Sequence, residues 1–91
     1  MNNENNQDSP LEFPCHFPLK VMGATDGPFK ETMITIVRNH IPALKDEHIH
    51  ERKSSSNKYI SLTLTVYVSS REQLDCIYRE LHASGHVLMA L

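Results

Sequence analysis

Residues 59–68 read YISLTLTVYV, and this stretch decides the fold class of the chain. Its apolar residues are Ile60, Leu62, Leu64, Val66 and Val68. The residues between them are Tyr59, Ser61, Thr63, Thr65 and Tyr67. Alternation with a period of two is typical of a β-strand. One apolar and one hydroxyl-rich face predict a sheet that packs helices on one side and leaves the other side open.

The segments after this strand predict a helix and a last strand. Residues 69–73 read SSREQ, in which each serine has a Glu or Gln three positions later, the spacing of a capping box. Gly85 is the expected end of the helix, and residues 86–91, HVLMAL, read as a final strand. The helix has an apolar stripe made of Leu74, Ile77, Tyr78 and Leu81.

A charged strand is expected before residue 59. Residues 45–53, KDEHIHERK, carry Ile49 as their single apolar side chain, which suits an exposed edge strand whose charges discourage aggregation. Residues 54–57, SSSN, then form a hairpin loop.

The N-terminal half predicts one more strand and one more helix. Residues 17–22, FPLKVM, alternate with a period of two, and residues 23–27, GATDG, read as a turn. Pro28 is tolerated in a first helical turn, and Pro42 ends the helix. The helix has an apolar stripe of Phe29, Met33, Ile36 and Val37, continued by His40 or Ile41.

The order strand, helix, strand, strand, helix, strand predicts an α+β fold. We expect a ferredoxin-like βαββαβ sandwich, with a four-stranded antiparallel sheet and two helices on one face. Residues 1–10, MNNENNQDSP, are expected to be a disordered tail, and residues 11–91 a single ferredoxin-like domain. The expected core is Phe17, Leu19, Val21, Phe29, Met33, Ile36, Val37, Ile49, Ile60, Leu62, Leu64, Val66, Leu74, Ile77, Leu81, Val87 and Met89.

Composition excludes several classes of protein. The chain has 91 residues with a net charge of −2, which favours one domain and argues against a general nucleic-acid binder. No apolar run approaches the ~20 residues of a membrane-spanning helix. Two cysteines supply neither a disulfide framework nor the four thiolates of an iron–sulfur cluster. We therefore expect a cytoplasmic protein without membrane contact.

The sequence predicts no catalytic, cofactor or metal residues. His48 and His50 would share one face of the edge strand. In the expected strand order the first strand lies between the third and the fourth, so His16 is two strands from this pair, roughly 10 Å away and too far to share one tetrahedral ion. Cys15 and Cys76 are single thiols, and Cys76 lies beside the apolar stripe of the second helix. Nothing local pairs a nucleophile with a base, so the chain is not expected to be an enzyme.

Three motifs resemble the YbeD-like family of small bacterial proteins of unknown function. They are residues 12–23, which begin EFP and end KVMG, the loop KSSSNKYIS at 53–61, and VLMAL at 87–91. The resemblance runs from about Leu11 to Leu91. It implies a ferredoxin-like fold, a cytoplasmic protein and no established enzymatic activity, with similarity to small regulatory domains such as the ACT domain.

The turn at 23–27 is a candidate small-ligand site. Free amides at the start of the following helix, together with Gly23, Thr25, Asp26 and Gly27, would hold the polar groups of a small-molecule effector. The ligand-binding turn of ACT domains lies at this place. The alternative is that the glycines merely permit the turn and that Thr25 or Asp26 caps the helix.

The open face of the sheet is the candidate partner site. We expect a non-catalytic regulatory or adaptor module that binds a protein partner, or a second copy of itself, through this face. The alternative is an RNA-binding module that uses the same face, although the arginine–glycine–aromatic signature is absent. The residues predicted to carry the contact are Lys20, Met22, Thr63, Thr65, Tyr67 and Leu88.

Overall fold

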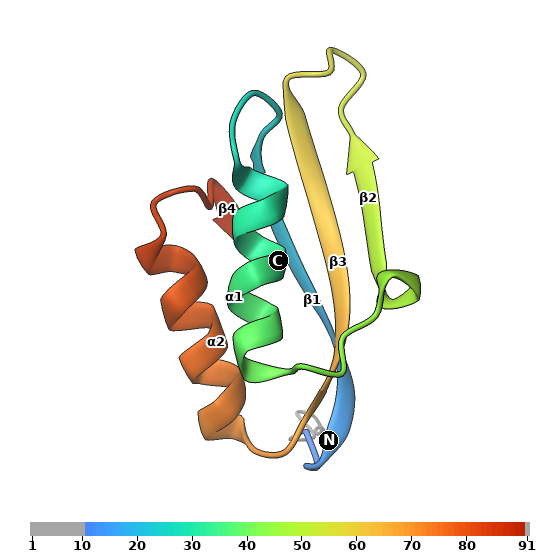
Figure 1. Cartoon of the computed structure of the whole chain (residues 1–91), viewed down its shortest axis with the longest axis vertical. Coiled ribbons are helices and arrows are strands. Elements are labelled where there is room, and N and C mark those ends of the chain that lie inside the picture. The colour runs from blue at the N-terminus through green and yellow to red at the C-terminus, as the bar shows by residue number, and fades with distance from the viewer. Residues whose placement is uncertain (1–10, 91) are drawn as a thin grey trace, which may run out of the picture.

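The computed structural model describes residues 11–90 of the chain (Figure 1). The expected tail at 1–10 lies outside this range, as does Leu91. The elements in chain order are β1 (Cys15–Ala24), α1 (Phe29–His40), a short 3-10 helix η1 (Asp46–His48), β2 (Ile49–Lys53), β3 (Tyr59–Val68), α2 (Arg71–Ala83) and β4 (Met89–Ala90). Within residues 11–90, neither helix has the length and apolar character that crossing a bilayer requires.

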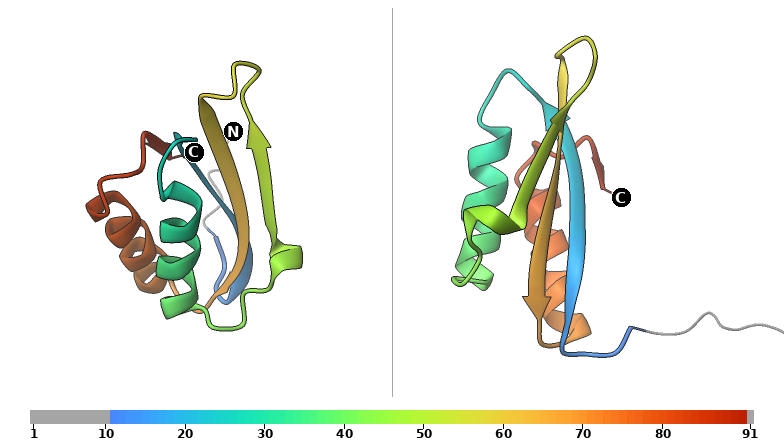
Figure 2. Two further views of the ribbon diagram at one scale, coloured as in Figure 1. Left: turned by 45° about the horizontal axis from the view of Figure 1, so that its top comes forward. Right: turned by 90° about the vertical axis from the view of Figure 1, so that its right-hand side faces the viewer.

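The four strands form one antiparallel sheet in the order β2-β3-β1-β4. The two helices lie side by side against one side of this sheet (Figures 1 and 2). The predicted α+β architecture, the strand order and the placement of β1 between β3 and β4 are therefore confirmed.

The core lies between the sheet and the two helices. On β3 the apolar residues are buried, as the alternation predicted, and Leu62 and Leu64 are fully inaccessible to solvent. Leu19 and Val21 of β1 lie beside them in the register, opposite Leu64 and Leu62. The helices add Phe29, Met33 and Val37 from α1, and Leu74, Ile77 and Leu81 from α2.

Two core residues come from the irregular segment after α1. Ile41 and Leu44 are buried, although the sequence did not place Leu44 in the core and left Ile41 as an alternative to His40. The Arg38 Nε donates a hydrogen bond to the Leu44 carbonyl at 3.1 Å, and this bond holds the segment against the helix. Some expected core residues are only partly buried: Phe17, Ile36, Ile49 and Val87.

Several element boundaries differ from those expected. β1 continues through Gly23 and Ala24, so the strand includes the first part of the expected turn. Residues 46–48 form η1, and β2 begins only at Ile49. His48 and His50 consequently do not share one strand face, and the His48 Nδ1 accepts a hydrogen bond from the Lys45 amide instead.

The two helices begin differently. The Ser70 hydroxyl accepts a hydrogen bond from the Gln73 amide at 3.1 Å, which confirms one of the two predicted starts of α2. Gly85, with a φ of 80°, follows the end of this helix as expected. α1 begins after Pro28 without a side-chain cap, so the expectation that Thr25 or Asp26 caps it is wrong.

An ion pair joins the edge strand to the helical layer. The Lys30 ammonium on α1 donates a hydrogen bond to the Glu51 carboxylate on β2. This bond and the positive charge of Lys30 lower the pKa of the Glu51 carboxyl from its ordinary value. Because successive residues of a strand point to opposite sides, the side chains that flank Glu51 face away from the helices.

Candidate binding face

The uncovered side of the sheet is built by alternate residues of all four strands. β3 contributes its hydroxyl-rich face, and the register places Lys20 opposite Thr63, Met22 opposite Ser61 and His16 opposite Tyr67. His50 and Arg52 of β2 stand opposite Thr63 and Ser61. We call this surface the open face, and its residues are His16, Pro18, Lys20, Met22, His50, Arg52, Tyr59, Ser61, Thr63, Thr65, Tyr67 and Met89.

Five of the six residues predicted for the partner contact occupy the open face. They are Lys20, Met22, Thr63, Thr65 and Tyr67. Tyr67 is 53% exposed although it belongs to a central strand. This exposure follows directly from the alternation along residues 59–68, because no helix covers that side.

Leu88 does not belong to the open face, which corrects the sequence prediction. Its amide donates a hydrogen bond to the Met22 carbonyl at 2.8 Å, but the paired residues of β4 are Met89 and Ala90. In the observed register Met89 stands opposite Met22, and Ala90 packs against the core. The expected register differs from this one by one residue, and such a shift moves each side chain of a strand to the other side of the sheet. The exposed Leu88 side chain lies beside Pro28 and His86 instead. Met89, expected in the core, is 49% exposed.

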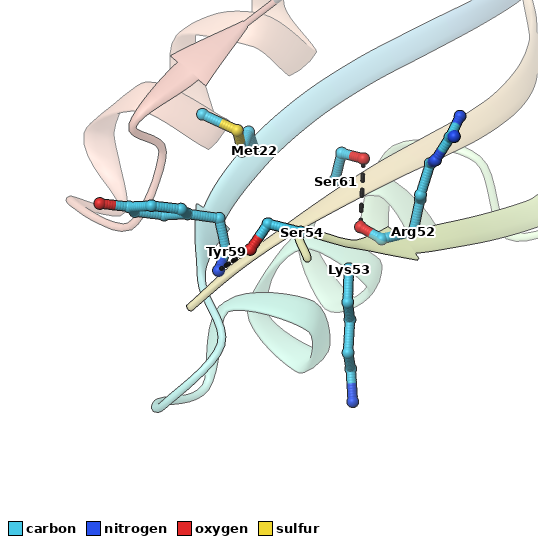
Figure 3. A pocket seen from close by; sticks show the side chains of 6 residues that line it. All are labelled: Met22, Arg52, Lys53, Ser54, Tyr59 and Ser61. Carbon is cyan, nitrogen blue, oxygen red and sulfur yellow. Dashed lines mark hydrogen bonds between the residues drawn. The ribbon is translucent and has the colours of Figure 1, made fainter. Parts of the chain in front are cut away.

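One end of the open face is apolar. Met22 and Met89 are cross-strand neighbours, and the exposed Tyr59 lies at the same end. Figure 3 shows Met22, Tyr59 and Arg52 around a shallow hollow, with Ser61 between them. Ser54 and Lys53 also line this hollow, but the Lys53 side chain extends away from Met22, Tyr59 and Arg52, toward the opposite side of the sheet.

The middle of the open face is basic. Lys20 and Arg52 border a second hollow together with His50, Glu51, Ser61 and Thr63. None of the twelve residues that make up the open face carries a carboxylate. Glu51, which precedes Arg52, places its carboxylate on the helical side with Lys30. The protein is acidic overall, so the positive charge of this surface is a local property.

An aromatic pair closes the other end of the open face. The rings of His16 and Tyr67 stand 4.8 Å apart with an interplanar angle of 52°. They border a hollow with Thr65 and the segment that contains Lys45 and His48. The face thus runs from two methionines and a tyrosine, across cations and hydroxyls, to a tyrosine and a histidine.

The predicted small-ligand turn is largely occupied by contacts within the protein. Gly23 is a buried residue of β1 that lies directly beneath the Phe29 ring. The Thr25 amide donates a hydrogen bond to the Lys58 carbonyl at 2.9 Å, and its hydroxyl donates one to the Asn57 carbonyl at 2.8 Å. These bonds join the turn to the β2–β3 loop.

The remainder of that turn is exposed. Asp26 and Gly27 are exposed, and Asp26 borders a hollow with Thr25, Asn57, Lys58 and Tyr59. Gly27 has a φ of 147°, a conformation that favours glycine. The structure therefore assigns Gly23 and Thr25 to packing and loop closure, and leaves Asp26 as an exposed residue of the turn that borders this hollow.

One cluster of reactive side chains lies outside the open face. Among residues 11–90, His40, Cys76 and Glu80 bring their nitrogen, sulfur and oxygen atoms within 4.8 Å of one another. Reasoning from the sequence missed this cluster, because His40 comes from a different helix. The available signal was the i, i+4 spacing of Cys76 and Glu80, which places both on one side of α2.

The family of the chain follows from comparison with known proteins. A family model described as "Protein of unknown function (DUF493)" matches residues 8–91. The chain belongs to this family. The match confirms the resemblance to YbeD-like proteins that residues 12–23, 53–61 and 87–91 indicated.

The names of individual relatives also assign no function. A UPF0250 protein of Neisseria meningitidis is 46% identical over 91 residues, which covers all of both chains. A UPF0250 protein of Nitrosomonas europaea is 38% identical over 85 residues, covering 93% of this chain and 98% of that one. One from Paraburkholderia phytofirmans is 44% identical over 82 residues, 90% of each chain. These names indicate no enzymatic role.

A solved structure supports the fold alone. The solution structure of protein HP0495 from H. pylori matches with a TM-score of 0.65 at 16% identity, covering 91% of this chain and 87% of that one. A similarity of this kind extends to the arrangement of strands and helices, and function must be argued from the side chains of the site.

Proposed function

We propose that this member of the DUF493 family is a non-catalytic binding module whose open face holds a protein partner with an acidic surface. The observation that carries the proposal is the composition of that face. It combines exposed Met89 and Tyr67 with the cations Lys20 and Arg52, and its residues include no carboxylate. Methionine, tyrosine and arginine are favoured in protein interfaces, and complementary charge guides association.

A protein partner fits this face better than RNA. An RNA-binding sheet stacks neighbouring bases on aromatic side chains of its central strands. Tyr59 and Tyr67 stand eight residues apart on β3, which corresponds to roughly 27 Å at the usual rise of a strand. Between them lie Ser61, Thr63 and Thr65, which offer hydroxyl groups but no ring on which a base could stack. The His16 ring already contacts that of Tyr67 at one end of the face, so it adds no ring to the span between the two tyrosines.

Charge also argues against a second copy of this chain as the partner. A two-fold contact through the open face would bring the basic middle of one copy against that of the other. Lys20 and Arg52 would then face like charges, whereas a partner that presents Asp and Glu side chains would pair with them. A small-molecule effector at the turn is the weaker proposal, because Gly23 and Thr25 are engaged within the protein.

Neighbouring residues of β2 provide a matched test of this proposal. Arg52 lies on the open face and Lys53 on the other side of the sheet, so Arg52→Glu and Lys53→Glu make the same charge change on opposite sides (Figure 3). We expect Arg52→Glu to weaken capture of the partner from native lysate at least tenfold, while Lys53→Glu retains it. Quantitative mass spectrometry of the captured proteins, with and without nuclease, measures the effect.

The same capture distinguishes the alternatives. A partner held through acidic residues should be released by salt and should survive nuclease treatment. Equal capture by the two variants would contradict a role for the open face. Nuclease-sensitive recovery of ribonucleoproteins would contradict the protein partner and favour RNA.

A further inference from the structure

His40, Cys76 and Glu80 meet where the end of α1 packs against the middle of α2. His40 is the last residue of α1, and Cys76 and Glu80 lie one turn apart on α2. The His40 Nε2 stands 3.1 Å from a Glu80 carboxylate oxygen. The ligand atoms of all three side chains lie within 4.8 Å of one another.

We propose that these three side chains form a zinc site with one coordination position left for water. Sulfur, imidazole nitrogen and carboxylate oxygen are the three donor types that Zn²⁺ accepts, and three protein ligands with an open fourth position are a common arrangement. A thiolate and an imidazole together favour zinc over Mg²⁺ and Ca²⁺, which prefer oxygen ligands. The proposal is independent of the proposed partner contact, because the cluster belongs to the helical layer.

The observed spacing requires only small movements. In a tetrahedral zinc site with bonds of ~2.0–2.3 Å, ligand atoms stand about 3.5 Å apart. The three atoms here lie within 4.8 Å, so rotations about side-chain bonds, rather than a shift of the helices, can close the site. The ion would replace the close contact between the His40 Nε2 and the Glu80 carboxylate, and the Cys76 thiol would release its proton to solvent.

Partial burial suits such a site. The His40 side chain is 19% exposed and the Glu80 side chain 51% exposed, while Cys76 is of intermediate exposure. The ion would thus reach the cluster from the Glu80 side and contact a thiol that is partly shielded from solvent. Its binding would join the C-terminal turn of α1 to α2 and stabilise the contact between the helices.

Titration of the full-length protein with Co²⁺, and competition with Zn²⁺, tests the site. With the thiols kept reduced, we expect one Co²⁺ per chain, a thiolate-to-metal absorption band and displacement of this band by one equivalent of Zn²⁺. Cys76→Ser should abolish the band. Glu80→Gln should weaken affinity at least tenfold, and the exposed position of Glu80 keeps this change from disturbing the core.

Two control variants make the test specific. Cys15→Ser removes the other cysteine, and His82→Gln removes an exposed histidine of α2 outside the cluster, so both should bind as the unchanged protein does. Circular dichroism establishes that each variant is folded. Absence of the thiolate band in the folded, unchanged protein would overturn the proposal. The same holds if the band survives Cys76→Ser or is lost with Cys15→Ser.

Discussion

Replacement of Leu64 by alanine is expected to lower the free energy of unfolding by about 2–5 kcal/mol, the range for truncating a buried leucine. Leu64 is fully inaccessible to solvent and lies opposite Leu19 of β1 and Ile49 of β2. Its truncation leaves a cavity in the core between the sheet and the helices, and the surrounding side chains fill such a cavity only in part. Urea titration followed by circular dichroism measures the loss.

The adjacent Thr63 is the matched control. It belongs to the same central strand, but its side chain lies on the open face, where no helix covers it. We expect Thr63→Ala to cost well under 1 kcal/mol, as for an ordinary surface substitution. Similar losses at the two positions would contradict a sheet that is packed on one side only.

Gly23→Ala is expected to destabilise the protein by about 1–3 kcal/mol or more, the cost of overpacking a core. A methyl group on Gly23 would collide with the Phe29 ring. Phe29 is 2% exposed, so the ring has little room to withdraw. The pairing of Gly23 with Ile60 of β3 also restrains the backbone. Denaturant titration gives the size of the loss.

A double-mutant cycle with Phe29→Leu identifies the cause of that loss. The smaller leucine side chain should accept the added methyl group, so Gly23→Ala should cost less in the Phe29→Leu background than in the unchanged protein. An equal cost in both backgrounds would show that the ring contact does not explain the requirement for glycine. This cycle also tests the assignment of Gly23 to packing rather than to ligand binding.

The parts of the fold that the sequence predicted are those with a clear period. Residues 59–68 alternate without interruption, so both the strand and its two faces followed from the sequence. Residues 87–91, VLMAL, are apolar throughout. Without polar residues between the apolar ones, the sequence does not show which side chains face the core. The register of β4 therefore depends on its pairing with β1, and the sequence assigned Met89 and Leu88 to the wrong environments.

Irregular segments were the other source of error. Leu44 follows Pro42 and Ala43, where no helical or strand period continues, and its burial depends on how the chain returns toward β2. His48 appeared to continue the edge strand, but residues 46–48 turn as a 3-10 helix. In both places the tertiary packing, rather than the local pattern, determines the conformation.

The same distinction between local pattern and tertiary packing applies to the candidate sites. The open face could be predicted because its residues on β1 and β3 are those that alternate with the buried apolar residues. The positive charge of its middle could not, because it required the register that brings Lys20 and Arg52 to the two sides of β3. The cluster of His40, Cys76 and Glu80 depends on how two helices pack, which the local patterns of the sequence do not show.

Photo-cross-linking in living cells tests most directly whether the open face binds a protein partner. A photoreactive phenylalanine analogue in place of Tyr67 keeps an aromatic ring on the open face, where the native residue is 53% exposed. The same analogue in place of Asp75, an exposed residue of α2, provides the control on the helical layer. A binding role of the open face predicts a covalent adduct with a protein that has an acidic surface from position 67, and none from position 75. Adducts that form from position 75 and not from position 67 would contradict it.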